Sequence, residues 1–317
     1  MNKMKGIFGI GIDFGATQIK IGAVTRRGKV VLKKVISTPK QILPRQFVRM
    51  TAKEIVSLLK GCSQPRQCYG IGIGVPGLVN SDRGLVEYLV NVKGWKKVPL
   101  ARLMQRQMKL KVRVDNDVNA MTLGELKFGA GRGCRNLVCL TLGTGVGGGI
   151  VIHGELYRGA TYSAGEIGHV VVEKEGRPCA CGGIGCLEAY VGNRRIVEQA
   201  RAMIEGKSSL LNQWVQKGEP LSPKLISQAA RRGDLAAQAV WKEVGAHLGV
   251  ALTSVVNLLN PERIIIGGGV ANTGTVLFEV IRKTVRQRAM KGPADSVKIV
   301  KAELGEDAGI VGAAMLI

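Results

Sequence analysis

The sequence predicts an α/β protein whose two domains face each other across a cleft. With 317 residues, 45% of them hydrophobic, the chain is long enough for two domains that each have a core. A strand, a glycine-rich turn and a returning strand occur near the N-terminus and again after residue 137, so the two halves repeat one unit. Other predicted strands lead into polar clusters and helical segments, as in open α/β sheets.

The first strand–turn–strand unit starts with an apolar strand at residues 8–12 and returns at residues 19–24. Its turn contains Asp13, Gly15 and Thr17. Glycine amides and a threonine hydroxyl are suited to hold phosphate oxygens, and Asp13 can hold a magnesium ion through water. Taken alone, the pattern also fits an ordinary hairpin with a glycine turn.

The second unit has a strand at residues 137–142, a turn over residues 143–149 and a returning strand at residues 150–152. Thr144 and Gly145 lie in this turn. Because the unit repeats the first one in the other half of the chain, we interpret it as a second phosphate-binding turn that faces the first across the cleft.

A third glycine cluster follows the predicted strand at residues 263–266 and consists of Gly267, Gly268 and Gly269. Glycines at a strand end allow a flat or charged ligand to approach the backbone closely. The spacing is not that of a dinucleotide-binding fingerprint, and the sequence contains no Walker motif. The cluster therefore indicates a ligand contact without identifying the ligand.

A polar cluster, residues 115–119, follows a predicted strand and precedes a helix expected from residue 120 toward residue 128. At such a strand end Asp117 can accept a proton from a hydroxyl group, while the carboxamide of Asn116 orients that group. Asp and Asn are also favoured helix N-caps. We predict that Asn119 or another neighbour of Val118 is the N-cap. Asp117 is then the residue predicted to accept the proton.

Residues 165–188 contain a candidate metal centre. Cys179, Cys181 and Cys186 are separated by a glycine-rich loop, and His169 can supply a fourth ligand. A Cys₃His set fills the tetrahedral shell of zinc, so the predicted ion is structural. A disulfide or buried thiols are the alternatives, but three clustered cysteines cannot all pair with one another. Glu166 and Glu188 flank the loop, which would fix both carboxylates.

The net charge of +23 is large, and a basic surface attracts polyanions such as nucleic acid, anionic membranes and polyphosphate. The lysines and arginines are dispersed along the chain, which favours a generally basic solvated surface. An aromatic content of 4% argues against base stacking as the main function. Seven cysteines, no signal peptide and no apolar run of about 20 residues favour a cytoplasmic protein.

Other features are interpreted as structural. Residues 235–259 predict one long amphipathic helix that ends before Pro261. Residues 192–218 are the least patterned helical stretch and are a candidate surface for a partner subunit. His153 and His247 have no cluster of partners in the sequence, so both are interpreted as structural or solvated.

Together these motifs resemble the ROK family of bacterial sugar kinases and repressors. The motifs that carry the resemblance are the two glycine hairpins, the cluster at residues 116–119, the segment 165–169 and the cysteine loop at residues 179–188. The family belongs to the hexokinase, actin and Hsp70 superfamily, so the resemblance implies two ribonuclease-H-like domains that close on a cleft. We expect a small domain at residues 1–117, a large domain at residues 118–300, and a C-terminal helix within residues 301–317 that returns to the small domain.

The resemblance implies transfer of the γ-phosphoryl group of ATP to a hexose hydroxyl, usually the 6-hydroxyl. Asp117 would be the general base. The implied sugar-binding residues are Asn116, Glu166, His169 and Glu188, together with Gly77 after a strand at residues 70–74 and Asn91 in the next loop. His169 would serve both zinc and sugar through its two nitrogens.

On the nucleotide side, the resemblance places Asp13, Gly15 and Thr17 at magnesium and phosphate. Thr144 and Gly145 would contact the terminal phosphates, and Gly267, Gly268 and Gly269 would lie at the adenosine. These assignments imply ATP and Mg²⁺ as cofactors beside a structural Zn²⁺.

The loop at residues 91–100 resembles that of glucose-specific members, which makes glucose the favoured sugar. Kinases of N-acetylmannosamine, N-acetylglucosamine, fructose and allose share the motifs and remain alternatives, as does polyphosphate as the donor. A sugar-sensing repressor is the other class, but about a dozen residues precede the first hairpin, too few for a helix-turn-helix. A homodimer is implied by the family alone.

Overall fold

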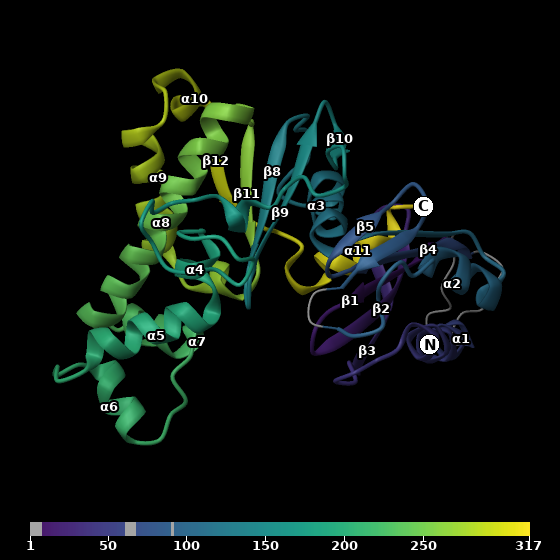
Figure 1. Ribbon diagram of the computed structural model, residues 1–317, viewed down its shortest axis with the longest axis horizontal. Helices are drawn as coiled ribbons and strands as arrows, with labels where there is room; N and C mark the ends of the chain where they lie inside the picture. The colour runs from purple at the N-terminus through teal and green to yellow at the C-terminus, as the bar shows by residue number, and fades with distance from the viewer. Residues whose placement is uncertain (1–7, 61–67, 90–91) are drawn as a thin grey trace.

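The computed structural model describes residues 8–60, 68–89 and 92–317. It contains two five-stranded mixed sheets with helices around them (Figure 1). The first sheet has the order β3-β2-β1-β4-β7 and the second has the order β10-β9-β8-β11-β12. In each sheet the first three strands are antiparallel and the last two pair in parallel, so one topology occurs twice.

The strands lie close to their predicted positions. The first sheet consists of β1 (Phe8–Phe14), β2 (Gln18–Thr25), β3 (Val30–Ser37), β4 (Cys68–Val75) and β7 (Val112–Asn116). The second consists of β8 (Leu137–Leu142), β9 (Val146–Ile152), β10 (Glu155–Tyr157), β11 (Arg263–Gly267) and β12 (Lys298–Lys301). The repeated order confirms the prediction of two ribonuclease-H-like units. The domain boundary at residue 117 stays a prediction.

One strand prediction was wrong: β9 starts at Val146 and not at residue 150. The tight turn spans only Gly143–Gly145, where the Gly143 amide donates to the Gly145 carbonyl oxygen. Gly147, Gly148 and Gly149 therefore belong to the strand. Their role is to allow close packing, which is described with the site below.

The first sheet packs on α1 (Pro44–Lys60) and α2 (Leu100–Met108) and carries a two-stranded ribbon of β5 (Leu78–Asn80) and β6 (Leu85–Tyr88). Trp95 is fully buried in this core, against Phe14 and Phe47. Its indole N–H donates to the Ile42 carbonyl oxygen at 2.8 Å, which satisfies its only polar atom. The aromatic group connects β1 to α1.

The second sheet packs on α8 (Leu235–Leu259), whose bounds match the predicted long helix, and on α9 (Thr275–Arg288). Further helices extend from this layer: α4 (Glu188–Val191), α5 (Asn193–Ile204), α6 (Leu210–Gln216), α7 (Pro223–Arg231) and α10 (Lys291–Ser296). Ile196, Ala200 and Leu211 are buried, so part of the least patterned stretch packs into the core. No helix in the described ranges is long and apolar enough to cross a membrane.

Two helices lie between the sheets, α3 (Asp117–Phe128) and α11 (Ala308–Ala314) (Figure 1). The last helix thus returns to the first sheet, over fewer residues than the predicted range. The backbones approach closely: a side chain at Gly11 or Gly72 would overlap a carbonyl of α11, and one at Gly312 would overlap the Ala120 carbonyl of α3. The contact between the two halves therefore depends on missing side chains.

A fully buried carboxylate completes this junction. Glu125 of α3 accepts three backbone N–H groups, from Ala130 at 2.8 Å, Glu303 at 3.1 Å and Leu304 at 2.8 Å. Because Glu303 and Leu304 lie between β12 and α11, the carboxylate ties the returning chain to α3. Charge-assisted bonds of this kind are stronger than those between neutral groups.

We expect Gly312→Ala to lower the free energy of unfolding by about 1 to 3 kcal/mol, because the added Cβ forces α3 and α11 apart. The matched control is Gly292→Ala in α10, where a Cβ meets no atom within 4 Å. That variant should match the parent or gain slightly, since alanine favours helix. Urea denaturation measures both, and equal stability of the two variants would contradict the close contact.

Candidate active site and metal centre

Asp117 lies where β7 ends and α3 begins, as the first residue of the helix. The predicted cap was wrong: the N-cap is Asn116, and its Oδ1 accepts from the amides of Val118 at 2.8 Å and Asn119 at 3.1 Å. Asn116 can do this because its backbone is extended, with φ −61° and ψ 147°. Capping by Asn116 turns the chain so that Asp117 starts the helix at a strand end.

Asp13 and Asp117 lie near each other across β4. Asp13 is in register with Gly74, and a Cβ at Gly74 would come 3.2 Å from the Asp117 Cα. Burial and the charge of Asp13 raise the pKa of Asp117 from 3.8 to about 6, although its bonds to backbone amides oppose the shift. Burial likewise raises the pKa of Asp13, opposed by Lys20 and Lys33. The pair combines a base that titrates near neutrality with a second acid suited to a cation.

The first hairpin turn is held by its own hydrogen bonds. The Gly15 amide donates to the Gln18 carbonyl oxygen at 3.0 Å, so it is not free for a phosphate. The Thr38 hydroxyl donates to the Gly15 carbonyl oxygen at 2.8 Å, and the Thr38 amide donates to the Thr17 carbonyl oxygen. Thr17 itself is exposed at the tip. The turn is thus held by three hydrogen bonds and exposes the Thr17 side chain at its tip.

The second hairpin turn is held by the segment after the cysteine loop. Glu188, the first residue of α4, accepts from the Val146 amide at 2.8 Å and lies against Gly145. The Asn193 amide donates to the Gly143 carbonyl oxygen at 2.9 Å. Thr144 is exposed at the tip. The structure thus brings Glu188, predicted at the sugar, into contact with the turn predicted at the phosphates.

Three successive glycines of β9 bring the site elements together. A Cβ at Gly147 would come 2.5 Å from Val118, and one at Gly149 would overlap Thr122, so these positions face α3. Gly148, on the opposite face, lies against Gly165 and Ile167. Alternate residues of a strand face opposite sides. The strand therefore packs α3, which starts with Asp117, on one face and the segment that carries Glu166 on the other.

The third glycine cluster lies beside the second hairpin. Gly267 pairs with Thr141 in register, and Gly268 has a φ of 84° and packs against Leu142. A Cβ at Gly269 would meet no atom within 4 Å, so space is open there. The cluster and the hairpin therefore share the carboxyl-terminal end of the parallel pair β8–β11, where ligands bind in open α/β sheets.

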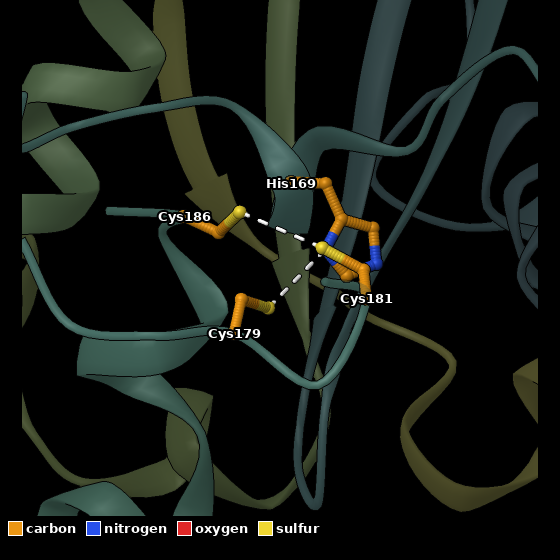
Figure 2. Close-up of side chains that lie close together, drawn as sticks. All are labelled: His169, Cys179, Cys181 and Cys186. Atoms are coloured by element: carbon orange, nitrogen blue, oxygen red, sulfur yellow. Dashed lines mark hydrogen bonds between the residues drawn. The ribbon is translucent and has the colours of Figure 1, made fainter. Parts of the chain in front are cut away.

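The predicted metal ligands converge (Figure 2). One atom from each of His169, Cys179, Cys181 and Cys186 lies within 4.8 Å of the others. The Sγ atoms of Cys181 and Cys186 are 3.7 Å apart, as are the Cys179 Sγ and the His169 Nδ1. A tetrahedron with Zn–S bonds of about 2.3 Å has edges of about 3.8 Å. The donor set and its spacing therefore fit tetrahedral zinc.

The electrostatics of the cluster favour a cation. Burial, together with hydrogen bonds and charge from the neighbouring sulfurs, raises the pKa of Cys186 to about 12. Three sulfurs this close cannot all be thiolates unless a cation neutralises them. His169 faces the sulfurs with Nδ1, while its Nε2 lies 3.9 Å from the Glu166 carboxylate. The second nitrogen thus points to the residue predicted to bind sugar, as a metal-bound imidazole requires.

The structure describes one of the two further predicted sugar contacts. Gly77 has a φ of 117°, and its carbonyl oxygen accepts from the Asn116 Nδ2 at 3.1 Å. This bond joins the turn after β4 to the β7–α3 junction. Asn91 lies outside the described residues.

Sequence reasoning missed a buried ion pair next to Asp117. Asp115, 1% exposed, accepts two hydrogen bonds from Arg158, which lies 43 positions later in the chain. Asp115 was visible as part of the polar cluster, but nothing in the sequence indicates a partner at that separation. His247, interpreted as structural, stacks on Tyr190 with ring centroids 4.4 Å apart and lies within the core layer of α8.

Known proteins of similar sequence include kinases and a repressor. The chain is 38% identical over 311 residues to a glucokinase of Halalkalibacterium halodurans, covering 97% of this chain and 94% of that protein. It is 33% identical over 308 residues to a xylose repressor of Caldicellulosiruptor bescii, covering 96% of this chain and 76% of the repressor.

Solved structures agree with the sequence comparison. The crystal structure of a ROK family glucokinase from Streptomyces griseus, in complex with glucose and AMPPNP, matches with a TM-score of 0.81 and 34% identity, and 98% of each chain is covered. A model of the ROK family matches residues 9–317. The repeated sheets, the hairpins and the cysteine loop all lie within that match, and the chain belongs to the ROK family.

Proposed function

We propose that this protein is an ATP-dependent kinase that transfers the γ-phosphoryl group of ATP to the 6-hydroxyl of glucose. The proposal is carried by Asp117, a partly buried carboxylate of raised pKa at the end of β7, on the helix that packs against the glycines of β9. Similarity to the Halalkalibacterium halodurans glucokinase, and to a glucokinase crystallised with glucose and AMPPNP, supports glucose as acceptor and ATP as donor.

In the proposed mechanism Asp117 accepts the proton of the attacking hydroxyl. The Val118 amide donates to its Oδ1 at 3.0 Å, and an ionised carboxylate has several acceptor positions, so it can also accept from a substrate hydroxyl. Its raised pKa matches a base that works near neutral pH. Phosphoryl transfer needs positioning and charge neutralisation more than covalent chemistry.

Asp13 is the residue proposed to hold magnesium. Its carboxylate offers the oxygen ligands that Mg²⁺ prefers, and its raised pKa reflects a burial that a cation would relieve. When bound, Mg²⁺ supplies neutralisation of phosphate charge. Thr17, Thr144 and Gly145 are proposed to contact the phosphates, and Gly15 is proposed to support the first turn, because its amide is bonded to the Gln18 carbonyl oxygen. Gly267, Gly268 and Gly269 are proposed at the adenosine. Thr17 and Thr144 fit this role because both are exposed at hairpin tips.

The sugar is proposed to bind between Asp117 and the metal loop, with contacts from Asn116, Glu166, His169, Glu188, Gly77 and Asn91. The side chain of Glu166 is 64% exposed and has room for a ligand. Asn116 uses Oδ1 for the backbone of α3 and one Nδ2–H for Gly77, and its side chain also contacts the Asp117 carboxylate, so it lies where the attacking hydroxyl would bind. Each buried sugar hydroxyl needs such a partner, because an unpaired one costs about 1 to 3 kcal/mol.

We propose zinc as a structural ion on His169, Cys179, Cys181 and Cys186. Four protein ligands leave no open position for catalysis. A cytoplasmic location is proposed as well, because a cluster of thiolate ligands persists in a reducing compartment. A homodimer is proposed from the family alone.

A coupled assay over a panel of hexoses should give the highest kcat/KM with glucose and ATP. The panel includes fructose, N-acetylmannosamine and N-acetylglucosamine, and each sugar is also tested with polyphosphate as the donor. A sugar site discriminates by the hydroxyls it pairs, so the preferred sugar should lead by at least about tenfold. A higher kcat/KM for an amino sugar, or for polyphosphate, would replace glucose or ATP in the proposal.

Asp117→Asn should lower kcat by about 10² or more and leave glucose binding nearly unchanged, because the amide cannot accept the proton. Since the folded-state pKa lies above 3.8, the stability of the parent falls as pH rises from about 4 through about 6. The variant removes that penalty and should be more stable by about 1 to 2 kcal/mol at pH 7.5. Steady-state kinetics, calorimetric binding and urea denaturation measure the three effects; retained turnover would exclude Asp117 as base.

Cys181→Ser should lose zinc and lower the thermal midpoint together, because the metal supplies folding energy to the loop. Metal analysis of the purified parent should find one zinc per chain. Cys134→Ser is the matched control, since Cys134 is a buried thiol outside the cluster, and it should keep its zinc. A parent protein without zinc would refute the metal assignment.

A further inference from the structure

Arg158 connects the two sheets beside the candidate base. It follows β10 at the edge of the second sheet, yet its side chain reaches Asp115 on β7 of the first sheet. Its Nε and Nη2 donate to the Asp115 Oδ2 at 2.9 and 2.6 Å. Nη1 donates to the Leu156 carbonyl oxygen at 3.3 Å, which fixes the guanidinium at both ends.

Burial decides how much this contact matters. The Asp115 side chain is 1% exposed and that of Arg158 is 28% exposed, so the pair is largely screened from water. Exposed ion pairs contribute little, whereas removal of one partner of a buried pair leaves an uncompensated charge. In the described part of the chain, Arg158 is the cation that pairs with Asp115. The carboxylate therefore depends on Arg158.

The other oxygen of Asp115 organises the start of α3. Its Oδ1 accepts from the Asn116 amide at 2.8 Å and from the Asn119 Nδ2 at 3.1 Å. Asn116 in turn caps the helix and bonds Gly77. Asp117 lies between Asn116 and Val118, so each of its neighbours is held by this network.

We propose that Arg158 is a positioning residue for Asp117. From the second sheet it holds Asp115, and through Asp115 it fixes the turn that aims the Asp117 carboxylate. The inference rests on the proposed kinase function, with Asp117 as base. Catalysis is sensitive to such placement, because a shift of about 1 Å in a reacting group can cost about 10²-fold in rate.

The chain offers a matched control in the same segment. The Tyr162 hydroxyl donates to the Asp82 Oδ2 at 2.7 Å, and Asp82 lies in the turn between β5 and β6. This bond also joins the two halves, but it is exposed, and Asp82 is distant in sequence from the β7–α3 junction. Its loss should therefore matter little to Asp117.

The test compares Arg158→Met, Arg158→Lys and Tyr162→Phe by kinetics and calorimetric glucose binding. We expect Arg158→Met to lower kcat by about 10²-fold, with a smaller rise of no more than about tenfold in the KM and Kd for glucose, because the same carboxylate also holds Asn116. Arg158→Lys keeps the charge but loses the two-point contact, and should lower kcat by about tenfold. Tyr162→Phe should stay within about twofold of the parent.

A double variant separates positioning from simple loss of fold. Asp115→Asn with Arg158→Met removes both charges, so no buried carboxylate is left unpaired, and it should recover part of the kcat lost in Arg158→Met. If Arg158→Met does not fold, Arg158→Lys and the double variant carry the comparison. An unchanged kcat in Arg158→Lys, or a loss confined to KM, would overturn the positioning role.

The parent enzyme separates this inference from the proposed function. A parent that phosphorylates no hexose would refute the proposed function, whatever the variants do. An active parent whose Arg158 variants keep full kcat would leave the kinase function in place and refute the role of Arg158 alone.

Discussion

The arrangement of the site depends on how closely three glycines of β9 let other segments approach. Gly147 and Gly149 face α3, and Gly148 faces the segment at residues 165–167. Three successive residues without side chains thus separate the helix that starts with Asp117 from the loop that carries Glu166. Any side chain there would widen the gap between Asp117 and Glu166, the acids proposed as base and as sugar contact. Gly312 plays the same part between α3 and α11, so α3 packs against glycines on both faces.

Three acids near α3 differ in how well their charge is satisfied. Glu125 is fully buried and accepts three backbone amides. Asp115 accepts from Arg158, Asn116 and Asn119. Asp117 accepts from the Val118 amide. Burial and the nearby charge of Asp13 raise the pKa of Asp117 to about 6. The first two acids therefore hold the structure, and the acid with the least satisfied charge is the one that we propose as the base. Proteins often concentrate such electrostatic cost at functional sites.

Much of this arrangement could be predicted from local patterns. The strand at residues 137–142 and the helix at residues 235–259 are marked by apolar periodicity and by a helix-ending Asn-Pro, so their bounds were right. The cysteine spacing also indicated the cluster that the structure brings together. The start of β9 was misplaced because glycine runs normally mark turns, and only tertiary packing shows that these glycines form a strand.

Other features depend on contacts that no local pattern encodes. Asn116 and Asn119 are equally good caps by residue type, and the choice depends on where β7 ends. Arg158 and Asp115 are 43 residues apart and belong to different sheets, so their pairing follows from the fold.

The metal loop shows the opposite case, in which residues close in sequence are fixed together. The proposed ligand His169 lies three residues after Glu166, and the proposed ligand Cys186 lies two residues before Glu188. A single ion would thus fix two carboxylates at once, one 3.9 Å from the metal-binding imidazole and the other bonded to the second hairpin through the Val146 amide. The proposed four-ligand site could therefore hold side chains on two separate segments, because short connections join its ligands to Glu166 and Glu188.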